Sequence, residues 1–189
     1  MWGPSATDSA LRAAAAFREK GYKEVLIPGI GYGRNAQPFL EAGMAVTGIE
    51  ISATALASLK ETFGSKISTF HGSVTDMPFE QKRYDGIFSF ALIHLLKEHE
   101  RHKFIASCFA QLKAGGTMVI VSIADTAPMF GTGVKIAERL YETMPGVRLF
   151  FYDEASIRRE FGAYGLANFQ PISEPTGLDF LWIECRKDT

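Results

Sequence analysis

The stretch that most constrains the fold runs from residue 25 to residue 35 and reads Val-Leu-Ile-Pro-Gly-Ile-Gly-Tyr-Gly-Arg-Asn. It opens as a short apolar run and then places a glycine at every second position, at Gly29, Gly31 and Gly33. A short apolar run that ends in turn residues is typical of a strand buried on both faces. Closely spaced glycines let the backbone turn tightly and approach a ligand, because they carry no Cβ. The stretch therefore predicts a buried parallel strand, a ligand-binding turn and then a helix.

An acidic residue follows this turn at an informative distance. The next apolar run ends in Glu50, about 20 residues beyond the glycines, where nucleotide-binding βαβ units place a carboxylate against ribose hydroxyls. A dinucleotide fingerprint needs its third glycine at the position that Arg34 occupies here. The spacing therefore favours a nucleoside site that is not built for a dinucleotide. A glycine-rich turn without a ligand is the alternative that these residues alone leave open.

The composition narrows the partners of the chain. Its 189 residues, 47% of them hydrophobic, suffice for one core, so we expect a single domain over residues 1–189. The 20 basic and 21 acidic residues balance, which argues against nucleic acid and anionic membranes as partners. Cys108 and Cys185 lie among apolar neighbours, as expected of reduced thiols, and we see no segment long enough to span a membrane. We expect a cytoplasmic monomer or homodimer that acts on a small molecule or on another protein, and we expect it to bind no metal ion.

Four segments in chain order carry a resemblance to a known family. The alternating glycines followed by Glu50 form the first segment, and residues 72–79, which end in Met-Pro-Phe, form the second. The third is Asp85 at the start of an apolar run, and the fourth is the Leu-Lys-Ala-Gly-Gly sequence at 112–116. Together they resemble the class I S-adenosylmethionine-dependent methyltransferases over residues 24–123. The resemblance implies a Rossmann-like, doubly wound α/β fold with helices on both faces of a mostly parallel, mixed sheet.

The same resemblance implies which residues hold S-adenosylmethionine as cofactor. They are Gly29, Gly31, Gly33, Arg34, Asn35, Glu50, Ile51, Ser73, Val74, Asp76 and Phe90. Two positions depart from the family pattern. Ile27 stands where many members carry an acid that helps to hold the cofactor's amino group, and Ser73 stands where an aspartate usually meets the adenine. The adenine amino group would then meet a hydroxyl, a backbone group or Asp76, which is alternatively a simple turn residue before Pro78.

Periodicity and turn residues predict the remaining elements. Helices are expected over residues 7–19, 35–42, 52–63, 98–112, 134–144 and 153–163. Strands are expected from residues 25 and 45, and over 66–70, 84–94 with its exit, 117–123, 167–173 and 178–186. The last two strands are joined by so short a turn that they must form an antiparallel hairpin, which distinguishes this sheet from an all-parallel dinucleotide fold. The helix pattern at 98–112 places Arg101 on the exposed face.

The implied reaction is methyl transfer from S-adenosylmethionine to a small-molecule acceptor, a thiol or chalcogen, an amine or a hydroxyl. The compact form is loosely similar to the tellurite-resistance and thiopurine-type methyltransferases. A non-catalytic S-adenosylmethionine-binding module that regulates a partner is one alternative, and a nicotinamide-dependent oxidoreductase is another. Residues 1–20 are interpreted as an N-terminal helix or lid, and residues 126–152 as an insertion that recognises the acceptor. The side chains expected in the acceptor pocket are Trp2, His94, Phe130, Phe151 and Tyr152.

Two of these assignments have a competing interpretation. His94 lies just beyond the fourth strand, and an imidazole there is suited to take a proton from the acceptor as a general base. Its neighbours are all apolar, so it is alternatively a partly buried residue that hydrogen-bonds the backbone. Trp2 is either part of a lid over the pocket or an aromatic plug at one end of the core.

Overall fold

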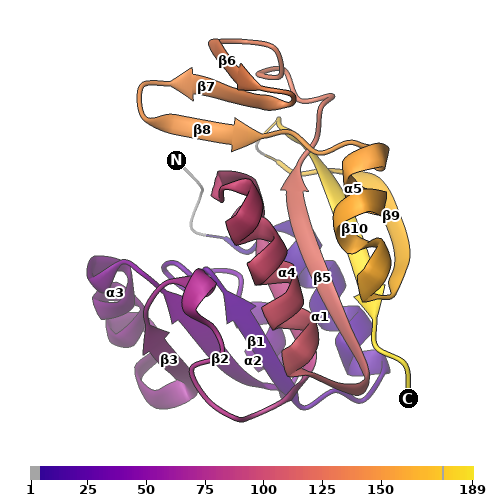
Figure 1. Ribbon diagram of the computed structural model, residues 1–189. Coiled ribbons are helices and arrows are strands. Elements are labelled where there is room, and N and C mark those ends of the chain that lie inside the picture. Colours follow the sequence, from indigo (N-terminus) through magenta and orange to yellow (C-terminus); the bar gives the residue numbers. More distant parts are fainter. Residues whose placement is uncertain (1–4, 176) are drawn as a thin grey trace.

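The computed structural model describes residues 5–175 and 177–189, so the predicted pocket residue Trp2 lies outside the described residues. Seven strands form the main sheet in the order β3-β2-β1-β4-β5-β10-β9 (Figure 1). They are β1 (Glu24–Pro28), β2 (Ala45–Glu50), β3 (Ile67–His71), β4 (Tyr84–Phe90), β5 (Leu112–Ile123), β9 (Leu166–Ser173) and β10 (Asp179–Arg186). The helices are α1 (Asp8–Glu19), α2 (Gln37–Glu41), α3 (Ala53–Phe63), α4 (Glu98–Gln111) and α5 (Glu154–Phe161).

The strand directions confirm the predicted mixed sheet. Strands β1 to β5 pair in parallel, whereas β10 runs antiparallel between β5 and β9. The chain winds outward from β1 through β2 to β3 and then returns to β4, which lies on the other side of β1. Open α/β sheets bind ligands at the carboxyl ends of the strands where the strand order reverses. The topology therefore points to the ends of β1 and β4.

The sheet is covered on both faces because its strands are apolar on both sides. Along β1, Val25 and Ile27 pack into the core that α1 and α2 complete, while Leu26 packs into the core of α4 and α5. Figure 1 shows α4 in front of the sheet and α1 behind it. The side chains of Thr7, Ser52 and Asp153 each accept a hydrogen bond from the first turn of the helix that follows them. Of the predicted helices before residue 112, α2 differs most from its predicted bounds, because it begins at Gln37 and not at residue 35.

The predicted helix at 134–144 is wrong. This segment forms the strands β6 (Val134–Ala137) and β7 (Leu140–Met144), which join β8 (Val147–Phe150) in a second, three-stranded antiparallel sheet. The helical spacing of its apolar residues is real, but Arg139 has a φ of 60° in the turn between the strands. A left-handed residue at that point is incompatible with a continuous helix. Pairing with β8 therefore overrides the local pattern, and Figure 1 shows the small sheet beyond the end of β5.

The predicted exposure of Arg101 is also wrong. Its side chain is almost fully buried, with the residue 3% exposed, and it forms a bidentate ion pair with Glu160 of α5 at 2.8 and 3.1 Å. The guanidinium also lies 3.8 Å from the ring centroid of Phe150, at the end of β8. The hydroxyl of Tyr152 donates to the same Glu160 carboxylate at 2.6 Å. Arg101 thus ties α4 to α5 and to the point where the chain leaves the small sheet.

Candidate functional site

The three glycines of the turn after β1 occupy conformations that other residues rarely adopt. Gly29, Gly31 and Gly33 have φ values of 71°, 57° and 84°. A Cβ on Gly29 would lie 2.9 Å from a methyl carbon of Leu92, and one on Gly33 would lie 2.8 Å from the Phe63 ring. A Cβ on Gly31 would meet nothing within 4 Å. The turn is therefore packed at both ends and open at its middle, which leaves room for a ligand over Gly31.

Glu50 connects this turn to the end of β2. One carboxylate oxygen accepts a hydrogen bond from the Gly31 N–H at 2.9 Å, and the other accepts one from the Ser52 N–H at 2.8 Å. Each carboxylate oxygen has a second lone pair, so the group still has capacity for two hydroxyl donors. Behind it, Gly48 leaves the space that Ile30 of the turn fills, because a Cβ at Gly48 would lie 2.5 Å from that side chain. The packing thus holds the turn and the carboxylate in a fixed relation.

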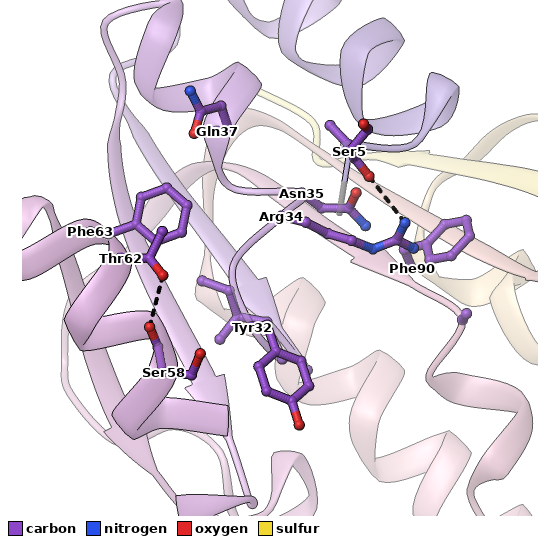
Figure 2. Close-up of a pocket in the computed structure, with 14 residues that line it drawn as sticks. Ser5, Tyr32, Arg34, Asn35, Gln37, Ser58, Thr62, Phe63 and Phe90 are labelled. Carbon is purple, nitrogen blue, oxygen red and sulfur yellow. Dashed lines mark hydrogen bonds between the residues drawn. The ribbon is translucent and has the colours of Figure 1, made fainter. Parts of the chain in front are cut away.

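A cavity of about 870 Å³ opens over the turn. Its lining, drawn in Figure 2, comes from the glycine turn, from α3, from the end of β4 and from the segment before α1. The lining residues are Ser5, Ala6, Gly29, Ile30, Gly31, Tyr32, Arg34, Asn35, Gln37, Ser58, Thr62, Phe63, Phe90 and Ala91. Ala91 has a φ of 54°, an uncommon conformation for a residue with a side chain, at the point where β4 enters the cavity wall. Such outliers cluster at functional sites.

Arg34 and Asn35 line this cavity and also hold the segment that precedes α1. The side-chain oxygen of Asn35 accepts hydrogen bonds from the N–H and the hydroxyl of Thr7, at 3.0 and 3.1 Å. Arg34 donates to the carbonyl of Ser5 at 3.1 Å, and its guanidinium lies 5.6 Å from the ring centroid of Phe90 (Figure 2). Burial lowers the pKa of Arg34, while the charge of Glu174 opposes this effect. Both predicted cofactor residues therefore also close one wall of the cavity.

The predicted adenine contacts gather at the ends of β2 and β3. Ile51, next to Glu50, is 67% exposed, which is unusual for a large apolar side chain but suits a residue that a ligand covers. Val74 is buried, and the Ser73 hydroxyl accepts from the Thr75 N–H at 3.2 Å, so Ser73 caps a short 3-10 turn at residues 74–76. Asp76, in this turn, is exposed. At position 73, where the resembled family usually has an aspartate, this chain therefore has a serine that caps a short turn.

His71 is a neighbour of this region that the sequence interpretation missed. It ends β3, and its Nε2 lies 3.0 Å from the carbonyl oxygen of Ile51. The contact holds the backbone of Ile51 beside Glu50. Glu174 was missed as well: it is buried, and its carboxylate accepts hydrogen bonds from the N–H groups of Asp8 and Ser9, both at 3.0 Å. Neither residue belongs to a recognisable sequence motif. Each acts through a hydrogen bond to a segment distant in the sequence, so residue spacing could not reveal it.

His94 is placed as its structural interpretation predicts. It is 6% exposed and does not line the cavity, and its Nδ1 accepts a hydrogen bond from the Ile123 N–H at 3.2 Å. The same nitrogen lies 3.2 Å from the Ser122 hydroxyl oxygen. Burial lowers the pKa of His94 to about 4, so the ring is a weak base at neutral pH. The geometry argues against a general-base role for this residue.

The predicted aromatic acceptor contacts lie in the core. Phe151 and Tyr152 are fully buried, and neither lines the cavity. Phe151 packs edge-on against Phe130 at a centroid distance of 5.3 Å, whereas Tyr152 packs on the opposite side with its hydroxyl bound to Glu160. Burial raises the pKa of Tyr152 well above its ordinary range. Both assignments are therefore corrected to structural roles. Phe130 is partly buried, packs against Tyr141 and Phe151, and does not line the cavity either.

Among the described residues, no helix is long and apolar enough to cross a membrane. In the same part of the chain, no group of three or more histidine, cysteine, aspartate or glutamate side chains is arranged to hold a metal ion. The two cysteines, Cys108 and Cys185, are buried and free.

Comparison with known sequences matches slightly less than half of the chain to a described domain. A family model described as a methyltransferase domain matches residues 25–116, from the start of β1 to the beginning of β5. A curated protein of Anoxybacillus flavithermus, named an uncharacterized methyltransferase, is 32% identical over 109 residues. That match covers 58% of this chain and 50% of the relative, so the chain matches about half of the length of its curated relative.

Solved structures share the fold across nearly the whole chain. A 1,6-didemethyltoxoflavin N1-methyltransferase of Burkholderia thailandensis, solved with that compound and S-adenosylhomocysteine, has a TM-score of 0.76 at 23% identity, covering 96% of this chain and 80% of its own. An amino pentose methyltransferase of Micromonospora echinaspora, solved with S-adenosylmethionine, has a TM-score of 0.69 at 16% identity, covering 93% and 90%. TehB of Haemophilus influenzae has a TM-score of 0.68 at 19% identity, covering 94% and 62%. At these identities the likeness establishes the fold.

Proposed function

We propose that this chain, which matches a methyltransferase domain over residues 25–116, transfers a methyl group from S-adenosylmethionine to a small-molecule acceptor. The observation that carries the proposal is the open middle of the glycine turn. It lies beside the Glu50 carboxylate and opens onto the cavity at the end of β4. A nicotinamide-dependent oxidoreductase is disfavoured by Arg34 and by the antiparallel hairpin of β9 and β10.

The residues at the strand ends fit S-adenosylmethionine in shape and charge. The remaining lone pairs of Glu50 suit the two ribose hydroxyls, since a carboxylate accepts such bonds strongly. The turn at Gly31 leaves its backbone accessible, as a ligand that lies across it requires. Exposed Ile51 and buried Val74 supply apolar surface for a flat base at the ends of β2 and β3. When bound, S-adenosylmethionine supplies the methyl group on a sulfonium sulfur.

The cavity over the turn extends to the end of β4, where it gives the acceptor a place to bind beside the cofactor. At about 870 Å³ it lies within the size range of small-molecule sites, and its walls come from four separate parts of the chain. Holding two reactants in line inside such a pocket is worth several kcal/mol, on the order of 7 to 11, in well-oriented reactions. The contribution that we propose for this chain is therefore alignment and exclusion of water. A pure regulatory module needs no acceptor cavity of this kind.

The compounds named for the structural relatives are 1,6-didemethyltoxoflavin and an amino pentose, both small molecules. We extend only that size class to this chain. Within it, thiols or chalcogens, amines and hydroxyls are the acceptor groups that the sequence interpretation proposes.

Turnover tests this proposal directly. The protein is incubated with S-adenosylmethionine and panels of small aryl thiols, phenols and amines, and the formation of S-adenosylhomocysteine is measured. We expect turnover above the no-protein rate with at least one class, and loss of that turnover in Glu50→Ala. Tight binding of S-adenosylhomocysteine without turnover on any class would favour the regulatory module instead.

A further inference from the structure

The described lining of the cavity carries charge of only one sign. Fourteen described residues line it, and among them Arg34 is the one with a charged side chain. This described lining contains no aspartate, glutamate, histidine or lysine. Much of the remaining wall is apolar, with Ile30, Phe63 and Phe90 as its largest apolar side chains. A cation beside apolar walls attracts anions more strongly than it would in water, because the local dielectric is low.

The guanidinium of Arg34 lies near the end of β4. It reaches Ser5 and the ring of Phe90, which ends β4, and Figure 2 shows it between these two residues. Glu50 ends β2, and the sheet order places β1 between β2 and β4. Two strand spacings amount to about 10 Å. The strand end beside the guanidinium is therefore two strands away from the carboxylate that we assign to the ribose.

The nearest buried carboxylate has a structural task. Glu174 acts electrostatically on Arg34 and is itself buried, at 5% exposure. Its two oxygens accept hydrogen bonds from the N–H groups of Asp8 and Ser9, so it caps the first turn of α1. Glu174 does not line the cavity. A ligand in the cavity therefore faces the positive charge of Arg34 and not the carboxylate of Glu174.

No described residue of the lining is suited to remove a proton from an acceptor. The polar side chains other than Arg34 are the hydroxyls and amides of Ser5, Tyr32, Asn35, Gln37, Ser58 and Thr62. Neutral hydroxyls and amides are poor bases at neutral pH. His94 is buried outside the lining, and its Nδ1 already accepts the Ile123 N–H. An acceptor in this cavity must therefore bring an available electron pair with it.

Resting on the methyltransferase function proposed above, we propose that the acceptor binds as an anion, a thiolate or a phenolate-like oxygen, with Arg34 as its charge partner. The anion's electron pair forms the new bond to the methyl carbon while the carbon–sulfur bond breaks and its electron pair stays on sulfur. The anion and the sulfonium both become neutral, and no proton moves. Neutralising two opposite charges is favoured in a pocket of low dielectric, whereas a protonated amine would meet positive charge there.

The probe for this proposal is 4-nitrophenol, which is yellow when ionised and nearly colourless when neutral. It is added to protein saturated with S-adenosylhomocysteine, near the pH at which half of the free probe is ionised. We expect binding to increase the yellow absorbance, because a nearby opposite charge lowers the pKa of an acid by about one unit or more. 4-Nitroaniline, a neutral probe of similar shape, should bind at least tenfold more weakly.

Two variants assign the effect to the charge of Arg34. Arg34→Met should lose the absorbance gain and bind 4-nitrophenol at least tenfold more weakly, while Arg34→Lys should keep the preference for the anion. Calorimetry with S-adenosylhomocysteine on each variant shows whether the cofactor site is intact. Wild type that fails to bind S-adenosylhomocysteine would overturn the proposed function as well.

Several outcomes overturn the anion proposal alone. These are equal binding of the two probes, binding of neither probe to protein that does bind S-adenosylhomocysteine, and an absorbance gain that persists in Arg34→Met. An Arg34→Met variant that loses at least tenfold in affinity for S-adenosylhomocysteine also overturns it, because Arg34 would then serve the cofactor's carboxylate.

Discussion

Two sides of this molecule are built in different ways: the nucleoside side, made of the glycine turn and Glu50, and the insertion at 126–152, none of whose described residues lines the cavity. The glycine turn and Glu50 are held by backbone conformation and by hydrogen bonds to neighbouring N–H groups. The insertion is held by strand pairing, by buried aromatic side chains and by the contacts of Phe150 and Tyr152 with the Arg101–Glu160 ion pair. The matched methyltransferase domain ends at residue 116, before the insertion begins. The difference shows that the glycine turn is a local property of the chain, whereas the insertion depends on the completed fold.

The largest effect is expected where the insertion is anchored to the body of the fold. Arg101→Met leaves the buried Glu160 carboxylate without its cation, and the loss in unfolding free energy should be about 3–5 kcal/mol. Urea denaturation measures it. The double variant Arg101→Met/Glu160→Met should recover much of that loss, because no buried charge remains. A loss below 1 kcal/mol in the single variant would mean that the anchor contributes little, which would weaken the contrast between the two sides.

The pattern of correct and wrong predictions follows the same division. Glycine spacing, turn residues and apolar periodicity act within a few residues, so they predicted the turn after β1 and the positions of the strands up to β5 along the chain. The helix predicted at 134–144 was wrong because apolar spacing cannot report a partner strand that follows in the chain. Arg101 was placed on the surface for a related reason, since its partner Glu160 lies 59 residues away.

The candidate site divides in the same manner. The glycines and Glu50 are recognisable from spacing, whereas the α3 residues of the cavity wall, such as Phe63, reach it only because the fold turns that helix face toward the glycine turn. Phe151 and Tyr152 were assigned to the pocket from aromatic density alone. The structure instead buries both side chains in the core. Aromatic density could not distinguish the two roles, because aromatic side chains fill cores as readily as they line binding sites.

The second prediction concerns His94, which is buried outside the cavity lining. Burial lowers its pKa in the folded protein to about 4 from an ordinary value of 6.5, so the unfolded chain takes up the proton first. The contribution of neutral His94 to the free energy of unfolding is therefore complete above pH 6.5, and it declines as the pH falls from 6.5 toward 4. The total decline should be roughly 3 kcal/mol.

Urea denaturation of wild type and His94→Gln at several pH values isolates this contribution. We expect the difference between the two proteins to shrink as the pH falls through that window. Parallel pH profiles would show that His94 is not held neutral by burial, and a turnover loss of at least 100-fold at neutral pH with unchanged cofactor affinity would restore it as a general base.

The third prediction addresses the nucleoside side alone. Gly31→Leu places a side chain in the open space over the turn, where no protein atom lies within 4 Å of the added Cβ, so affinity for S-adenosylhomocysteine should fall at least tenfold, equivalent to about 1.4 kcal/mol. The φ of 57° at position 31 should also lower the unfolding free energy of this variant by about 1–2 kcal/mol.

Gly21→Leu is the matched control, because Gly21 has a φ of 72° and equally open surroundings but lies at the end of α1. Gly21→Leu should lose the same unfolding free energy as Gly31→Leu, but it should bind S-adenosylhomocysteine with wild-type affinity. Equal affinity for S-adenosylhomocysteine in both variants would place the cofactor elsewhere.

The central claim is that Glu50 and the glycine turn hold S-adenosylmethionine, and calorimetric titration with S-adenosylhomocysteine tests it most directly. We predict that wild type binds S-adenosylhomocysteine and not NAD, and that Glu50→Ala binds it at least tenfold more weakly, since charge-assisted hydrogen bonds of this kind contribute about 1.5–3 kcal/mol. Glu50→Gln, which keeps one oxygen acceptor, should fall between the two. Unchanged affinity in a folded Glu50→Ala protein, or preferential binding of NAD by wild type, would contradict the account.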